Sequence, residues 1–139
     1  MSIMNLYIEN VIKRIKEGID EKDLEFIANT LIDLIHYAII LKEDNLIFIA
    51  SIMKDIVIDY SMILDEYILP EDFENRTIDK VMNFIEQPLN FLDKSDFTHD
   101  DIIWLFNWNK TIKNQIEKDM YLIRSKKDFK QKKISEFVE

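Results

Sequence analysis

The sequence predicts an all-α protein, a single-domain bundle of about six helices with a central apolar second helix. Three observations predict this class. Glycine and proline together occupy only three of the 139 positions, apolar residues recur at spacings of three and four, and no segment alternates as a strand would. The length suits one domain, and an apolar fraction of 47% supplies enough side chains for one core.

The first half of the chain divides at its turn residues. We expect a first helix over residues 2–17, stopped by Gly18, with Asp20 as the N-cap of the next helix. That second helix runs to Lys42, and its apolar residues cover about half of its circumference. Because such a helix is normally touched by neighbours on several sides, we expect it to be the central one.

The third helix follows the turn at residues 43–45, and we expect it to end before Pro70 because the residue before a proline disfavours helix. A break near Tyr60 is a further expectation. Residues 70–76 read as an acidic loop, after which Thr77 caps a shorter helix. Pro88 then starts a short helical turn over residues 89–92, since proline suits the first helical position.

The last long helix is expected over residues 99–124, with Thr98 and Asp101 spaced as a capping box. One apolar stripe follows the helical spacing and consists of Ile102, Leu105, Phe106, Trp108, Ile112, Ile116, Met120 and Ile123. We expect Trp108 to be core and Trp104, which falls beside the stripe, to be more exposed. Residues 1–124 thus form the helical domain, and residues 125–139 form a basic tail that either docks as a helix or frays.

The charge balance argues against one class of partner, nucleic acids. The chain has 27 acidic and 18 basic residues, a net charge of −9, so it repels phosphate and is not expected to bind nucleic acid. The most hydrophobic window, residues 24–41, contains Glu25, Asp33 and His36, which favours a soluble helix over a membrane span. The N-terminus lacks the apolar core of a signal peptide, and we expect a cytoplasmic protein.

Few residues in the chain are of types that could catalyse a reaction or bind a metal ion. The chain has no cysteine, one glycine and two histidines, which excludes a thiol nucleophile, a disulfide framework and a phosphate-cradling glycine loop. His36 and His99 each follow an aspartate by three residues, a spacing that suits a metal ligand pair but also a solvated surface pair. Asp55 and Asp59, one turn apart, either share a proton or are solvated. The sequence therefore nominates no catalytic residue, no metal ligand and no cofactor, and it predicts a protein that is not an enzyme.

Acidic residues are densest between residues 65 and 101, which hold 11 acids and 3 bases. This density exceeds what helix capping requires, so it marks either a solvated face or a surface that attracts a basic protein. Met62 lies opposite the main stripe of the third helix, among acids, and is either covered by another helix or the apolar centre of an interface. The candidate partner-binding residues are Asp55, Asp59, Met62, Asp65, Glu66, Glu71, Asp72 and Glu74.

Two likenesses bear on function. The composition is similar to that of immunity proteins, small acidic helical proteins that neutralise secreted bacterial toxins, often nucleases. This likeness implies a non-enzymatic, protein-binding inhibitor that occludes a basic partner. Alternatively, residues 107–110, Asn-Trp-Asn-Lys, share two residues with the Asn-Trp-Gly-Arg motif that opens a buried helix in Bcl-2 proteins, whose viral relatives are also helical. That resemblance implies a regulator with an apolar groove for an amphipathic helix. The sequence leaves the oligomeric state open.

Overall fold

The computed structural model describes residues 3–126 and 129–131 and confirms the all-α class. Its elements are α1 (Ile3–Glu21), α2 (Leu24–Leu41), α3 (Asp44–Glu66), β1 (Tyr67–Ile68), α4 (Glu71–Leu89), α5 (His99–Ser125) and β2 (Lys130–Gln131). These residues contain five helices instead of the expected six or so, because Pro88 lies inside α4 and starts no helix of its own: α4 ends at Leu89, and residues 90–92 form turns.

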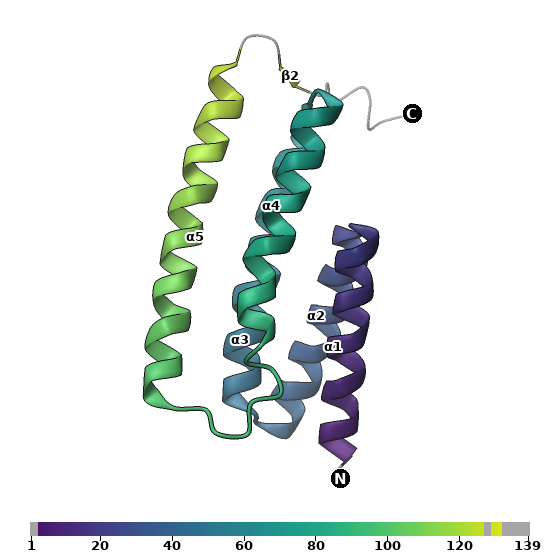
Figure 1. Cartoon of the computed structure of the whole chain (residues 1–139), viewed down its shortest axis with the longest axis vertical. Coiled ribbons are helices and arrows are strands. Elements are labelled where there is room, and N and C mark those ends of the chain that lie inside the picture. The colour runs from purple at the N-terminus through teal and green to yellow at the C-terminus, as the bar shows by residue number, and fades with distance from the viewer. Residues whose placement is uncertain (1–2, 127–128, 132–139) are drawn as a thin grey trace.

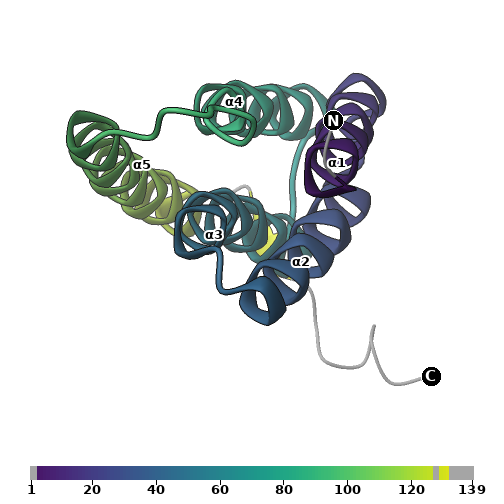
Figure 2. The same ribbon diagram turned by 90° about the horizontal axis from the view of Figure 1, so that it is seen from below.

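The helices run alternately up and down (Figure 1). Seen along the bundle, α3 lies between α5 and α2, and α4 lies across from α3 (Figure 2). The central position expected for the second helix is not confirmed, because α2 packs against α1 and α3 whereas α3 packs against α2, α4 and α5. At the end of the bundle that carries β1, α3 and α4 extend beyond the turn between α1 and α2 (Figure 1).

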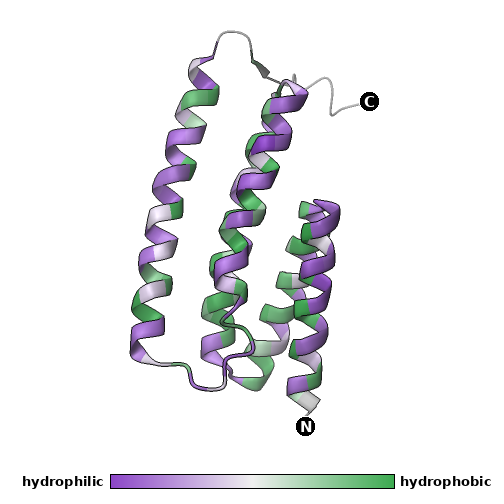
Figure 3. Cartoon of the chain, in the orientation of Figure 1, coloured by the Kyte–Doolittle hydropathy of each residue, from purple (hydrophilic) through white to green (hydrophobic). Residues whose placement is uncertain are grey.

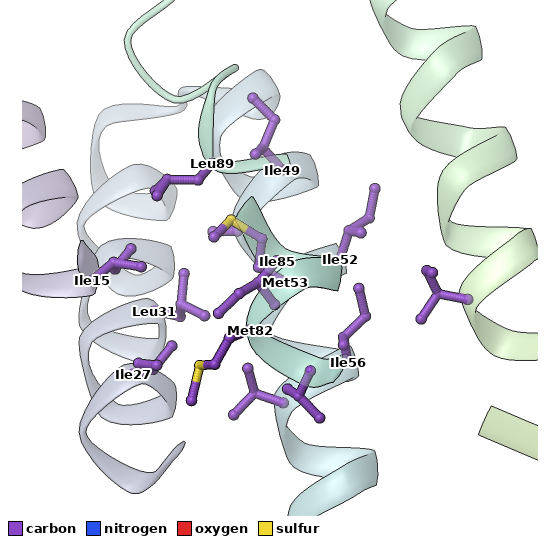
Figure 4. Packing of buried hydrophobic residues seen from close by; sticks show 14 of the residues in the cluster. Ile15, Ile27, Leu31, Ile49, Ile52, Met53, Ile56, Met82, Ile85 and Leu89 are labelled. Atoms are coloured by element: carbon purple, nitrogen blue, oxygen red, sulfur yellow. The ribbon is translucent and has the colours of Figure 1, made fainter. Parts of the chain in front are cut away.

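The core lies where α2, α3 and α4 meet (Figure 4). Ile27 and Leu31 of α2, Met53 of α3 and Ile85 of α4 are completely buried there. Apolar residues recur along the helices at helical spacing (Figure 3), and those that face a neighbouring helix form the core. Burial of these side chains supplies the main driving force for folding.

The outer part of α2 stays uncovered toward its C-terminal end, where Ile40 is 77% exposed. By length and composition α2 is the one helix of the described residues that is long and apolar enough to cross a membrane, a test that core helices of soluble proteins also pass.

Gly18 is not the stop of the first helix, as expected, but a buried residue inside it. A Cβ atom at this position would lie 2.5 Å from the Cγ1 atom of Ile27, so the glycine permits α1 and α2 to cross closely. The helix ends instead at Glu21, and the following residue, Lys22, adopts a left-handed φ of 56°. Asp23, and not Asp20, then caps α2 by accepting a 3.0 Å hydrogen bond from the amide of Phe26.

The acidic segment after Pro70 is helical, which corrects the expected loop. Pro70 is the N-cap of α4, and the acids Glu71, Asp72 and Glu74 form its first turn, where the helix dipole favours negative charge. Thr77 does not cap a helix. It is buried within α4, and its hydroxyl donates a 2.9 Å hydrogen bond to the carbonyl of Phe73. Nor does α3 break near Tyr60, which lies within the continuous helix.

The capping box of α5 is confirmed, with Thr98 accepting a hydrogen bond from the amide of Asp101 and donating its own amide to that carboxylate. The expected apolar stripe is correct at Leu105, Ile112, Ile116 and Ile123, which are buried. It is wrong at Phe106, which is 61% exposed, and at Ile102, because only a narrow strip of α5 faces α3 and α4.

The tail returns to the start of α4. Lys130 and Gln131 form β2, which pairs with Ile68 and Tyr67 of β1 in an antiparallel arrangement. Phe129 packs edge-to-face on Phe73, with ring centroids 5.0 Å apart. Of the described tail residues, Ser125 is the last residue of α5, and Lys130 and Gln131 form a strand. Residues 127–128 and 132–139 lie outside the described residues.

Candidate partner-binding surface

A broad hollow lies where α3 and α4 extend past the α1–α2 turn, and we call it the acidic depression. Its volume is about 820 Å³. The floor is apolar, and the rim carries five carboxylates from three separate parts of the chain. The floor residues are Leu24, Ala28, Ile58, Met62, Leu64 and Ile78, and the rim acids are Glu21, Asp23, Glu25, Asp65 and Glu74.

The charge of the depression is strongly negative. Lys22 is the single cation in the lining of the depression, and it forms a 2.8 Å ion pair with Asp79 of α4. Asp79 is not part of the lining, so the positive charge of Lys22 is balanced without any of the five rim carboxylates. The five rim carboxylates are exposed to solvent. A surface of this kind attracts cations and repels anions.

A second hollow, the α3–α5 groove, runs beside the depression and has a volume of about 320 Å³. Ile63, Ile116 and Met120 supply its apolar surface. Its charges are mixed, since Arg124 of α5 lies 3.7 Å from the carboxylate of Glu66 on α3. Met62 is 64% exposed and lines both hollows, so the two hollows adjoin at this residue.

Asp59 lies in this groove among groups that affect its ionisation. Partial burial raises the pKa of its carboxyl group, the neighbouring Asp55 raises the pKa further, and Lys113 of α5 opposes the rise. The carboxylates of Asp55 and Asp59 therefore repel each other, and the lysine on the facing helix offsets part of that repulsion.

The structure brings some of the sequence-predicted residues together and separates others. Asp65, Glu74 and Met62 meet in the acidic depression, although they come from α3 and α4. Asp59 and Glu66 lie in the α3–α5 groove.

The remaining three predicted residues line neither hollow. Asp55 forms a 3.5 Å ion pair with the adjacent Lys54. Glu71 and Asp72 are exposed in the first turn of α4, where their charges serve the helix dipole. Stabilisation of the helix N-terminus therefore accounts for part of the acid density of that turn. The density alone does not indicate a partner-binding surface there.

Glu21, Asp23 and Glu25 were missed as partner-binding candidates. From the sequence, these acids belong to the turn between two helices and to the first turn of the second of them. No local pattern shows that this turn lies beside the end of α3. A tertiary contact supplies that information, because the ion pair of Lys22 with Asp79 joins the α1–α2 turn to α4.

One polar cluster joins three helices away from these surfaces. Asp119 of α5 accepts a 2.6 Å hydrogen bond from the hydroxyl of Tyr60 on α3, which is fully buried, and a 3.2 Å bond from the amide of Gln115. Lys80 of α4 lies 3.1 Å from the same carboxylate. The carboxylate thus has a donor from each packed helix, which favours a structural role.

Metal-binding geometry is absent from the described part of the chain, where no group of three or more histidine, cysteine or acidic side chains is close enough to hold an ion. His36 and His99 are both exposed.

Comparison with protein-family models, with curated proteins and with solved structures gives no match to this chain.

Proposed function

We propose that the protein is a non-enzymatic inhibitor of the immunity type, which occludes a basic protein partner such as a toxin or nuclease by binding it at the acidic depression. The observation that carries this proposal is the combination of an apolar floor with five rim carboxylates from α1, the α1–α2 turn, α2, α3 and α4. An apolar centre with a polar rim is the usual anatomy of a protein–protein interface.

The two parts of the depression have different tasks in binding. The rim acids raise the rate of encounter with a basic surface, since long-range attraction steers association. Met62 supplies exposed apolar area on the floor, and a flexible methionine adapts to the shape of a partner. The partner therefore presents lysine or arginine around an apolar group.

The chemistry of the lining supports the non-enzymatic part of this proposal. The depression offers carboxylates, one paired lysine, one serine and apolar side chains. A general base and a nucleophile held within hydrogen-bond reach of each other would be needed for covalent catalysis, and Ser61 has no histidine among the lining residues. Cytoplasmic residence is part of the same proposal, because the inhibitor protects the cell that makes it.

The α3–α5 groove supports an alternative, a regulator that holds an amphipathic helix of its partner. Ile63, Ile116 and Met120 supply an apolar strip along the groove, and Met62 borders it. The segment Asn107–Lys110 lies inside α5 and opens no helix, so this alternative rests on the groove alone.

Affinity capture with matched variants tests the proposal. The wild-type protein, immobilised in lysate of its native host, is compared with the double variant Asp65→Lys/Glu74→Lys and with the control Glu71→Lys/Asp72→Lys. The control has the same charge and lies in the same part of the chain but outside the depression. We expect a basic protein to be retained by the wild type and by the control and lost from the depression variant.

Two other results contradict the proposal. Equal retention by all three proteins removes the depression from binding. Loss on replacement of Met120, a partly buried residue of that groove, by Asp, with retention by the depression variant, moves the binding surface to the α3–α5 groove and favours the alternative.

A further inference from the structure

A separate cavity lies between α4 and α5, and its chemistry is opposite to that of the acidic depression. This α4–α5 cavity has a volume of about 250 Å³. Phe73, Leu122 and Ile123 give it apolar walls. Thr77 also lines it, but the hydroxyl of Thr77 is bonded to the carbonyl of Phe73, so the residue contributes its methyl group to the cavity.

Two cations and one acid complete the lining, which leaves an excess of one positive charge. Lys80 and Asp119 are paired at 3.1 Å, and Asp119 also accepts hydrogen bonds from Tyr60 and Gln115. The carboxylate of Asp119 is therefore already saturated by donors. Arg76 supplies the excess charge.

The guanidinium of Arg76 keeps most of its donors available. Its Nε atom donates to the carbonyl of Asp72 at 3.3 Å, and its centre lies 6.0 Å from the centroid of the Phe73 ring. Within the described residues no carboxylate lies within 4.0 Å of its nitrogens, although the chain has 27 acids. The terminal nitrogens of Arg76 can thus bind an anion in the planar, two-point arrangement that suits a carboxylate.

We propose that the α4–α5 cavity binds a small carboxylate that carries an aromatic or branched apolar group. The carboxylate contacts Arg76 and Lys80, and the apolar group packs against Phe73, Leu122 and Ile123. The cavity volume of about 250 Å³ lies just below the range of about 300–1,000 Å³ of pockets for drug-sized ligands, so the cavity suits a smaller molecule. This inference is independent of the partner-binding proposal, because the cavity shares no lining residue with the acidic depression.

Calorimetric titration and NMR of the full-length protein test this site with phenylacetate and its neutral analogue phenylacetamide. We expect phenylacetate to bind, with chemical-shift changes at the methyl groups of Thr77, Leu122 and Ile123, and phenylacetamide to bind at least tenfold more weakly. An acetylated tetrapeptide ending in a free phenylalanine, compared with its C-terminal amide, forms a second arm. Binding of phenylacetate shows that a free small carboxylate suffices, whereas binding of the peptide alone assigns the site to the C-terminus of another protein.

The variant Arg76→Gln removes the available guanidinium without touching the Asp119 cluster. We expect it to weaken phenylacetate or peptide binding at least tenfold, while Arg124→Gln, an arginine that lines the α3–α5 groove, leaves binding unchanged. Equal binding of the acid and the amide, unchanged binding by Arg76→Gln, or the absence of binding in both arms would overturn the proposal.

Discussion

The indole nitrogen of Trp108 on α5 donates a 3.0 Å hydrogen bond to the carbonyl oxygen of Phe84 on α4. That carbonyl lies four residues before Pro88, in the position where a helix normally receives the amide hydrogen of residue 88. Proline has no such hydrogen. Trp108 therefore satisfies a backbone acceptor that the sequence of α4 leaves without its helical donor, and it joins the two helices at that point.

This relationship predicts energetic coupling between Trp108 and Pro88. Trp108→Phe keeps most of the ring but removes the donor, and an acceptor left unsatisfied in a partly buried site costs about 1–3 kcal/mol. In a Pro88→Ala background the amide of residue 88 can bond the Phe84 carbonyl, so the same change should cost less. Urea unfolding of the four proteins of this cycle measures the difference. An identical cost in both backgrounds would show that the two residues act independently.

The two tryptophans of α5 should differ in their contribution to stability. Trp104 is 38% exposed, whereas Trp108 is only partly buried and packs against the core, so the expectation that Trp108 is a core residue is wrong. We expect Trp108→Ala to lower the free energy of unfolding by at most about 3–5 kcal/mol, the range for a fully buried aromatic, and Trp104→Ala to cost clearly less. The rings stack with centroids 5.3 Å apart, so the double variant should cost less than the sum of the single variants. Equal single costs would contradict the exposure of the two rings.

Local patterns in the sequence predict much of this fold. Helical spacing places Leu105, Ile112, Ile116 and Ile123 correctly in the core, and the capping box at Thr98 marks the start of α5. These features depend on residues a few positions apart, which is the range that a sequence displays directly.

The errors occur where a distant contact decides the local structure. Gly18 resembles a helix stop, but α2 approaches it so closely that a side chain would collide with Ile27. Pro88 resembles a helix start, but Trp108 compensates its missing donor and α4 continues through it. For the same reason the sequence nominates Asp65 and Glu74 but not Glu21, whose place on the rim depends on how the α1–α2 turn packs.

Replacement of Gly18 by alanine should destabilise the protein, although alanine favours a helix by about 1 kcal/mol over glycine. The added Cβ would lie 2.5 Å from Ile27 Cγ1 and 3.1 Å from the ring of Phe26, so α1 and α2 must move apart. We expect a net loss of about 1–3 kcal/mol in the free energy of unfolding, the usual cost of overpacking. In an Ile27→Ala background, which removes the Cγ1 atom, Gly18→Ala should cost much less. A stabilising effect of Gly18→Ala alone would contradict the close crossing.

The buried tyrosine of the Asp119 cluster should make stability fall at alkaline pH. Burial raises the pKa of Tyr60 above its ordinary value, and so does its hydrogen bond to Asp119. The native state then keeps a proton that the unfolded state releases above about pH 10, so this contribution is fully present below that pH and is lost as the pH rises further. Between about pH 9 and pH 11, unfolding free energy should fall more steeply for the wild type than for Tyr60→Phe. Tyr121→Phe, at a ring that is 77% exposed, should follow the wild type.

The proposed inhibitor should show separate effects of the rim and the floor on binding kinetics, measured with the purified partner at two salt concentrations. Asp65→Lys/Glu74→Lys should slow association and weaken its salt dependence, because rim charges act mainly on encounter. Met62→Ala should instead speed dissociation, since the contacts of Met62 with the partner form only after the partner has covered the floor. Glu71→Lys/Asp72→Lys carries the same charge change on α4 but outside the depression, and it should slow association less.

If this control slows association as much as the rim variant, the net charge of −9 steers the partner and the depression has no special part in steering. If a rim carboxylate is desolvated against a lysine or arginine of the partner, its loss should also raise the dissociation rate and cost about 2–5 kcal/mol.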